Sequence, residues 1–209
     1  MKKYFTIFAL GMMALSTAAF AATTATGTNT VAPTLQISAT VQSAVQLTLS
    51  TGTSTAAHCA VTPGTGTDYL MSFGTVNALA LGTPTCGTAF APTTPGTTPA
   101  IYWSDYNVTP VWTSQATNNA TVTARVTTDF PSATRSLTVV RDSAGTGAVP
   151  AAIADFTPIS TATADTIVTT TNSGTAQTRF IGVQVAPTSG AGIPATAQTA
   201  TVTFTLTVN

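Results

Sequence analysis

The stretch ATVTFTLTV, residues 200–208, alternates apolar side chains with threonine along its whole length. A period of two places Val202, Phe204, Leu206 and Val208 on one face of a strand and the threonines on the other. Threonine and valine are branched at Cβ, which favours extended backbone over helix. The stretch therefore predicts a strand with one buried face and one face covered with hydroxyl groups.

The same alternation recurs along the chain. It is clear at 35–41 and 45–49, which are two strands or one strand with a bulge between its halves. Further strands are predicted at 69–76, 79–81, 107–113, 121–127, 137–141, 165–171 and 179–185. Turn-forming residues predict connections or irregular chain at 51–66, 84–99 and 142–158. Because proline has no N–H to donate, Pro110 predicts that its strand lies at an edge or a bulge.

Many short strands without a helical period predict an all-β fold. We expect an immunoglobulin-like antiparallel β-sandwich with Greek-key connections, in preference to a jelly roll. No repeat of fixed period is visible, which argues against a solenoid or propeller. The predicted domain is 34–209, preceded by a Thr/Ala-rich, flexible segment at 22–33.

The N-terminus has the features of a secretory signal peptide over residues 1–21. Lys2 and Lys3 precede an apolar run from Tyr4 to Leu15, and Ala19-Phe20-Ala21 follows. This order predicts export through the Sec pathway, cleavage after Ala21 or Ala22, and a secreted or cell-surface protein. The apolar run is shorter than the roughly 20 residues of a membrane span, so no membrane span is expected in the mature chain. The alternative is a buried N-terminal helix.

Charged residues are scarce. Once Lys2 and Lys3 are removed, four arginines face six aspartates, so the mature chain carries a net charge of −2. A chain so poor in cations has no electrostatic footprint for nucleic acid. The apolar content of 44% is that of a globular protein. We therefore expect a folded domain whose surface carries hydroxyls in place of ions.

Cys59 and Cys86 are the only cysteines. In an exported protein an even pair most simply predicts a disulfide, worth about 3 kcal/mol in the chain-entropy model. Two free thiols are the alternative. Cys59, Cys86 and His58 supply too few ligands at a usual spacing for a metal site. No cofactor is expected.

Catalytic chemistry finds little support in the sequence. His58 is the single histidine, and a Ser/His/Asp group would have to combine it with a serine and with Asp68 or Asp105. No nucleophile elbow, zinc helix or phosphate loop is present. We expect His58 to be structural or solvated, and we expect the protein not to be an enzyme.

The aromatic residues Tyr102, Trp103, Tyr106 and Trp112 form one cluster in the sequence. Exposed, they would make a binding surface for sugar rings or for a protein partner. Buried, they would be core or edge packing. The first alternative would make the protein a secreted adhesin or a carbohydrate-binding β-sandwich module.

Four features together resemble the bacterial pilin-like sandwiches of the spore coat protein U and archaic chaperone–usher pilin group. They are the signal peptide, the alternating segment Leu35 to Val41, and the strands SFGTV (72–76) and ATVTFTLTV (200–208). The resemblance implies a fimbrial subunit whose sandwich lacks one strand. The neighbouring subunit supplies that strand from its N-terminus, so that subunits join head to tail in a filament or surface coat.

On this resemblance, donor-strand complementation inserts Leu35, Ile37, Ala39 and Val41 of segment 34–41 into the next subunit. The partners are then identical subunits, with a periplasmic chaperone and an outer-membrane usher. The alternative is that 34–41 is the first strand of a complete domain.

Overall fold

The computed structural model describes residues 36–39, 44–54, 58–113, 119–131, 137–187 and 197–209. The chain divides into two units, Met1–Val41 and Gln42–Asn209. In the first unit the described residues 36–39 have no regular secondary structure and are exposed. The predicted signal peptide and the segment 22–33 lie outside the described residues.

The second unit is built of strands. Their bounds are β1 Val45–Thr51, β2 Val61–Pro63, β3 Tyr69–Met71, β4 Thr88–Phe90, β5 Ala100–Trp112, β6 Ala120–Thr128, β7 Leu137–Asp142, β8 Phe156–Pro158, β9 Asp165–Thr170, β10 Gln177–Val185 and β11 Thr201–Val208. A short 3₁₀ turn, η2, spans Ile153–Asp155, and the described residues contain no α-helix.

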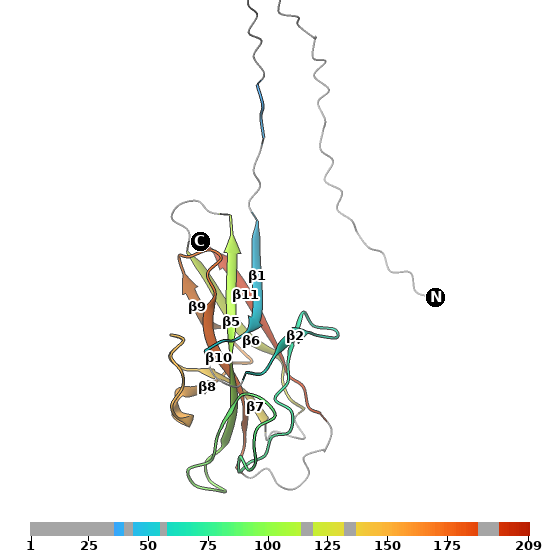
Figure 1. Cartoon of the computed structure of the whole chain (residues 1–209), viewed down its shortest axis with the longest axis vertical. Coiled ribbons are helices and arrows are strands. Elements are labelled where there is room, and N and C mark those ends of the chain that lie inside the picture. Colours follow the sequence, from blue (N-terminus) through green and yellow to red (C-terminus); the bar gives the residue numbers. More distant parts are fainter. Residues whose placement is uncertain (1–35, 40–43, 55–57, 114–118, 132–136, 188–196) are drawn as a thin grey trace, which may run out of the picture. The chain divides into compact units, whose positions relative to one another are not determined.

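All strand pairs are antiparallel and form two main sheets (Figure 1). One sheet has the order β1-β5-β10-β7-β8, with β4 also paired to β5, and the other has the order β11-β6-β9. β2 and β3 form a separate hairpin. The main apolar cluster joins Tyr106 and Val108 of β5 to Val122, Ala124, Ile167 and Val168 of β6 and β9. The all-β antiparallel prediction is confirmed, and this packing is consistent with a β-sandwich.

Pro110 lies in a part of β5 that has a strand on one side only. Up to Val108 the strand pairs with β1 or β4 on one side and with β10 on the other, and beyond Val108 it pairs with β1 alone. Pro110 pairs with Leu47 of β1 and lies beyond the last residue that pairs with β10. Its carbonyl accepts a hydrogen bond from Gly174 N on the β10 side. Because N–H and C=O of one residue point the same way in a strand, the missing N–H falls where the ladder with β10 has ended.

Three short strands lie inside segments predicted as connections. β2 lies in 51–66, β4 in 84–99 and β8 in 142–158. Conversely, 79–81 is a turn and not a strand. The Asn77 side chain accepts hydrogen bonds from Leu79 N (3.1 Å) and Leu81 N (3.0 Å), which replaces strand pairing there. Of the predicted strand 69–76 only Tyr69–Met71 is one, so the segment 72–76 is not a strand.

Candidate assembly edges and the disulfide corner

β11 forms one edge of its sheet. It pairs with β6, and no other described strand pairs with it. Its apolar residues Val202, Phe204 and Leu206 pack on the main cluster but stay half-buried, whereas Val122 and Ala124 on β6 are fully buried. The difference has a simple cause, since β6 has a strand on each side and β11 has one.

The register decides which backbone groups of β11 point outward. Asn209 and Asn119 exchange both hydrogen bonds (2.9 and 3.3 Å), so they form a hydrogen-bonded pair. Antiparallel pairs alternate, and therefore Thr207, Thr205 and Thr203 also direct N–H and C=O toward β6. Phe204 and Leu206 direct theirs away from β6, to the free edge.

β1 repeats this arrangement on the other sheet. Thr113 N donates to Ala44 O at 3.0 Å, which places the backbone groups of Leu47 and Leu49 on the side away from β5. The side chains of Leu47 and Leu49 pack on the same cluster as Phe204. β1 and β11 lie next to each other without pairing (Figure 1). Two free edges therefore offer backbone groups from half-buried apolar residues of one cluster.

Two of the four predicted donor residues lie in the described part of the chain. Ile37 is 84% exposed, and Ala39 is also exposed. Leu35 and Val41 lie outside the described residues. Ile37 is therefore a large apolar side chain that is exposed.

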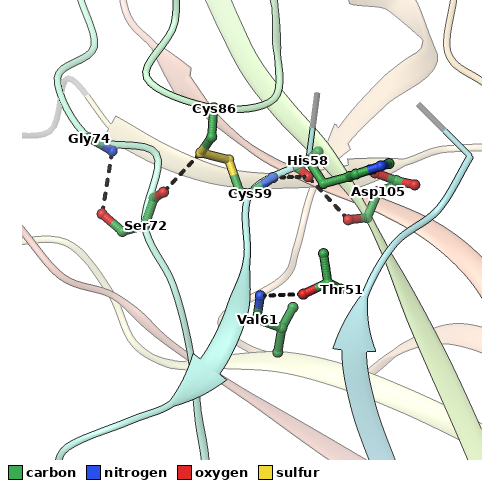
Figure 2. The surroundings of a disulfide bond; sticks show 9 residues. Thr51, His58, Cys59, Val61, Ser72, Gly74, Cys86 and Asp105 are labelled. Atoms are coloured by element: carbon green, nitrogen blue, oxygen red, sulfur yellow. Dashed lines mark hydrogen bonds and ion pairs between the residues drawn. A yellow bond between two sulfur atoms is a disulfide. The ribbon is translucent and has the colours of Figure 1, made fainter. Parts of the chain in front are cut away.

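The predicted disulfide between Cys59 and Cys86 is present, with the two Cα atoms 4.9 Å apart (Figure 2). Cys59 follows β1 and Cys86 precedes β4. β1 and β4 pair with successive parts of β5, at residues 106–112 and 101–103, so they form one interrupted edge. The bridge closes the base of the excursion between them. Gly87 has φ +68, and a Cβ there would overlap the carbonyl oxygen of Trp103.

Asp105 binds two residues that precede Cys59 in the chain, Ser54 and His58. Its carboxylate is fully buried and accepts hydrogen bonds from Ser54 N (2.6 Å) and Ser54 Oγ (2.9 Å) on Oδ2. His58 Nδ1 lies 2.7 Å from Oδ1. A Cβ at Gly52 would overlap this carboxylate, so glycine is required there. Burying a carboxylate is costly unless it is hydrogen-bonded, and these bonds fix Ser54 and His58 to β5.

The Ser/His/Asp combination considered from the sequence is therefore partly assembled, with Asp105 and not Asp68 beside His58. The arrangement differs from a catalytic triad, in which the serine hydroxyl bonds to the imidazole. Ser54 Oγ instead donates a hydrogen bond to the Asp105 carboxylate. This geometry suits a structural role for His58 next to the disulfide.

The four aromatic residues are buried, with exposed fractions of 2% for Tyr102, 3% for Trp103 and Tyr106, and 5% for Trp112. The binding-surface alternative is therefore corrected, because a sugar platform needs an exposed ring face. Trp103 packs with Phe90, Phe156 and Phe180 outside the main cluster. The Tyr102 hydroxyl bonds to the backbone of Asn77.

Burial also changes titration in the interior. It raises the pKa of Tyr106 well above its ordinary value of 10, and Asp142 adds to the rise. Burial lowers the pKa of Arg179, against the opposing effects of Asp142 and Tyr106. Arg179 Nε donates to Ile167 O at 2.7 Å, which satisfies it inside the protein.

The described residues contain no group of three or more His, Cys, Asp or Glu side chains that could hold a metal ion. No helix in the described part of the chain is long and apolar enough to cross a membrane. Comparison with protein families, with curated proteins and with solved structures found no match to this chain.

Sequence reasoning missed two groups of residues. It found β1 and β11 but not that they are edges, because alternation is the same in an edge strand and a central one. It also left Arg125 without a role, although a single long cation among the threonines of β6 is a visible signal.

Proposed function

We propose that the protein is a structural subunit of an extracellular filament or surface coat, assembled head to tail by donor-strand complementation. The observation that carries the proposal is the pair of free edges on β1 and β11. Both expose backbone groups of apolar residues from one cluster, so an inserted strand would gain hydrogen bonds on both sides and bury its apolar face.

The strand order supports an immunoglobulin-like reading of the sandwich. Such a sandwich has the order A-B-E-D in one sheet and C-F-G in the other. Taken in chain order, β1-β5-β10-β7 corresponds to A-B-E-D, and β6 and β11 correspond to C and F. The free edge of β11 is then the place of strand G. β9 departs from this scheme, because it joins the far side of β6 after the D strand.

The segment 34–41 suits the role of donor by its pattern. Leu35, Ile37, Ala39 and Val41 share one face, and Gln36, Ser38 and Thr40 share the other. Inserted between β1 and β11, the first face would meet Leu47, Leu49, Phe204 and Leu206. The proposed partners are identical subunits. A periplasmic chaperone and an outer-membrane usher enter through the resemblance to archaic chaperone–usher pilins.

The test compares two matched substitutions, Ile37→Asp and Ser38→Asp, in the protein purified from the cell surface. Both add one carboxylate to neighbouring positions of 34–41. Only Ile37 belongs to the face that would be buried, and burying an unpaired charge is costly. We expect Ser38→Asp and the parent protein to run as ladders of oligomers on gels of unheated samples, and to collapse to one band on boiling. Ile37→Asp should give the single band without heating.

The competing reading of 34–41, as the first strand of its own domain, gives a different result. The parent protein would then run as a single band before and after heating, and electron micrographs would show no filaments. Ladders that persist in Ile37→Asp would also contradict insertion of this segment.

A further inference from the structure

The outer face of the β11-β6-β9 sheet carries rows of threonine. Thr207 pairs with Thr121, which pairs with Thr169, and Thr205 pairs with Thr123, which pairs with Thr166. Neighbouring hydroxyls are therefore spaced about 4.8 Å across the strands and about 6.8 Å along them. The next row breaks the pattern, because Thr203 pairs with Arg125.

Arg125 lies in a shallow depression of this face. The depression has a volume of about 150 Å³ and is lined by Thr123, Arg125, Thr127, Ala164, Thr203 and Thr205. No carboxylate lines it. Thr127 and Thr203 are hydrogen-bonded to each other through their hydroxyls at 3.0 Å, which orders one wall.

Arg125 differs from the other arginines that the structure describes. Arg179 is buried and bonded to Ile167 O, and Arg141 lies 3.6 Å from Asp165 and donates to Asp142 O. Arg125 is exposed, and within the described residues its guanidinium has no ion pair or hydrogen bond. In a protein with so few charges, this is a cation with unused donors set among hydroxyl groups.

We propose that this depression binds an acidic group, carboxylate or sulfate, of a polysaccharide. The guanidinium fork matches either group with two parallel hydrogen bonds. The threonine hydroxyls both donate and accept, as sugar hydroxyls do. The volume of about 150 Å³ is below the roughly 300–1,000 Å³ of a pocket for a drug-sized ligand, and it suits one charged group.

The surroundings favour a polysaccharide over other anionic polymers. Nucleic acid binding depends on several cations along the backbone, and Arg125 is alone in its depression. A polysaccharide can continue over the threonine rows on either side, where hydroxyls meet hydroxyls without charge. The inference is independent of the filament proposal, since the outer face of this sheet is separate from the edges of β1 and β11. The proposed carbohydrate site is at Arg125 and not at the buried aromatic residues of β5.

The test measures binding by titration calorimetry with three carbohydrate probes. Oligogalacturonate supplies carboxylates, dextran sulfate supplies sulfates, and dextran is the neutral reference. We expect at least one acidic probe to bind and dextran to bind at least tenfold more weakly. Arg125→Gln should weaken binding of the acidic probe at least tenfold. Thermal unfolding checks that the variant is folded, and Arg125 is exposed, so its melting temperature should be unchanged.

A matched pair of threonines tests the position of the site. Thr205→Val removes a hydroxyl that lines the depression, and Thr207→Val removes one from the same face of β11 outside it. We expect the first to weaken binding several-fold and the second to leave it unchanged. The proposal is overturned if neither acidic probe binds at millimolar concentration, if dextran binds equally well, or if Arg125→Gln binds as the parent does.

Discussion

Asp105 shows how one buried carboxylate can hold two residues from a distant part of the chain. Its two oxygens hold Ser54 and His58, and Gly52 leaves room for it. Replacing it with alanine would leave the Ser54 N–H and hydroxyl without their acceptor in a part-buried place. Hydrogen bonds to charged groups are worth about 1.5 to 3 kcal/mol each, measured as the effect of deletion.

We predict that Asp105→Ala lowers the free energy of unfolding by about 3 kcal/mol, measured by urea denaturation with the disulfide intact. The control is Asp68→Ala, at an exposed aspartate, which should change stability by less than about 0.5 kcal/mol. Similar losses in both variants would show that Asp105 has no special role in holding Ser54 and His58.

Tyr106 gives a prediction on alkaline pH. Its folded-state pKa is raised by burial, while the unfolded chain titrates near 10. Above pH 10 the unfolded state therefore binds fewer protons than the folded state, and the free energy of unfolding falls as pH rises. We expect Tyr106→Phe to show a shallower fall between pH 10 and 12, by up to about 1.4 kcal/mol per pH unit. Equal slopes in urea titrations of the two proteins would contradict this.

At the residue scale, the sequence predicted the disulfide between Cys59 and Cys86, because only two cysteines are present. It did not single out side-chain contacts between residues that are far apart in the chain. The bond between His58 and Asp105 spans 47 residues, and on sequence grounds Asp68 was an equal candidate. The four aromatic residues are neighbours in the sequence, but Tyr102, Trp103 and Tyr106 belong to three separate apolar clusters of the structure. Their burial depends on β10 and β4, whose pairing with β5 no local pattern reveals.

At the scale of the element, β11 has two kinds of amide group. Those of Thr203, Thr205 and Thr207 point to β6, and those of Phe204 and Leu206 point to the free edge. Because the side chains alternate with them, the apolar residues are the ones whose backbone is unpaired within the sheet. An added strand would pair with those residues and leave the threonine ladder as it is.

We predict that amide hydrogen exchange separates the two sets. In the isolated subunit Phe204 and Leu206 should exchange much faster than Thr203, Thr205 and Thr207, since the latter are hydrogen-bonded to β6. In assembled material all five should be protected, and the gain should be confined to the first set. Protection of Phe204 and Leu206 in the monomer would mean that this edge is already covered. Fast exchange in the filament would mean that no strand adds there.

The elements differ in how well the sequence predicts them. β6 and β11 alternate because one face is in the core and the other in solvent. β5 was recognised only from residue 107, because residues 100–106 are buried on both faces and therefore do not alternate. The short strands β2 and β4 have three residues each and lie among prolines, glycines and threonines. These residues are typical of turns, so the sequence predicts connections there.

At the scale of the whole molecule, hydroxyl groups take the place that charges have on most protein surfaces. Among the described residues, Arg141 lies within ion-pair distance of Asp165, and the His58 imidazole, which is charged only when protonated, lies beside Asp105. Association of such surfaces would need little desolvation of charge, which is expensive. This property fits repeated packing of one subunit against another, and it leaves Arg125 as a distinct feature of the outer face.

The disulfide has a mechanical consequence for a chain pulled from its two ends. Tension would shear β1 from β5 and begin to draw out the excursion before β4. The bridge at its base would stop this, because the 27-residue separation between Cys59 and Cys86 cannot lengthen while the bond holds. At about 3.4 Å per residue, the disulfide prevents roughly 90 Å of chain from being extended. The folded domain would therefore lengthen less when it unfolds under tension. Reducing the disulfide would allow a larger extension.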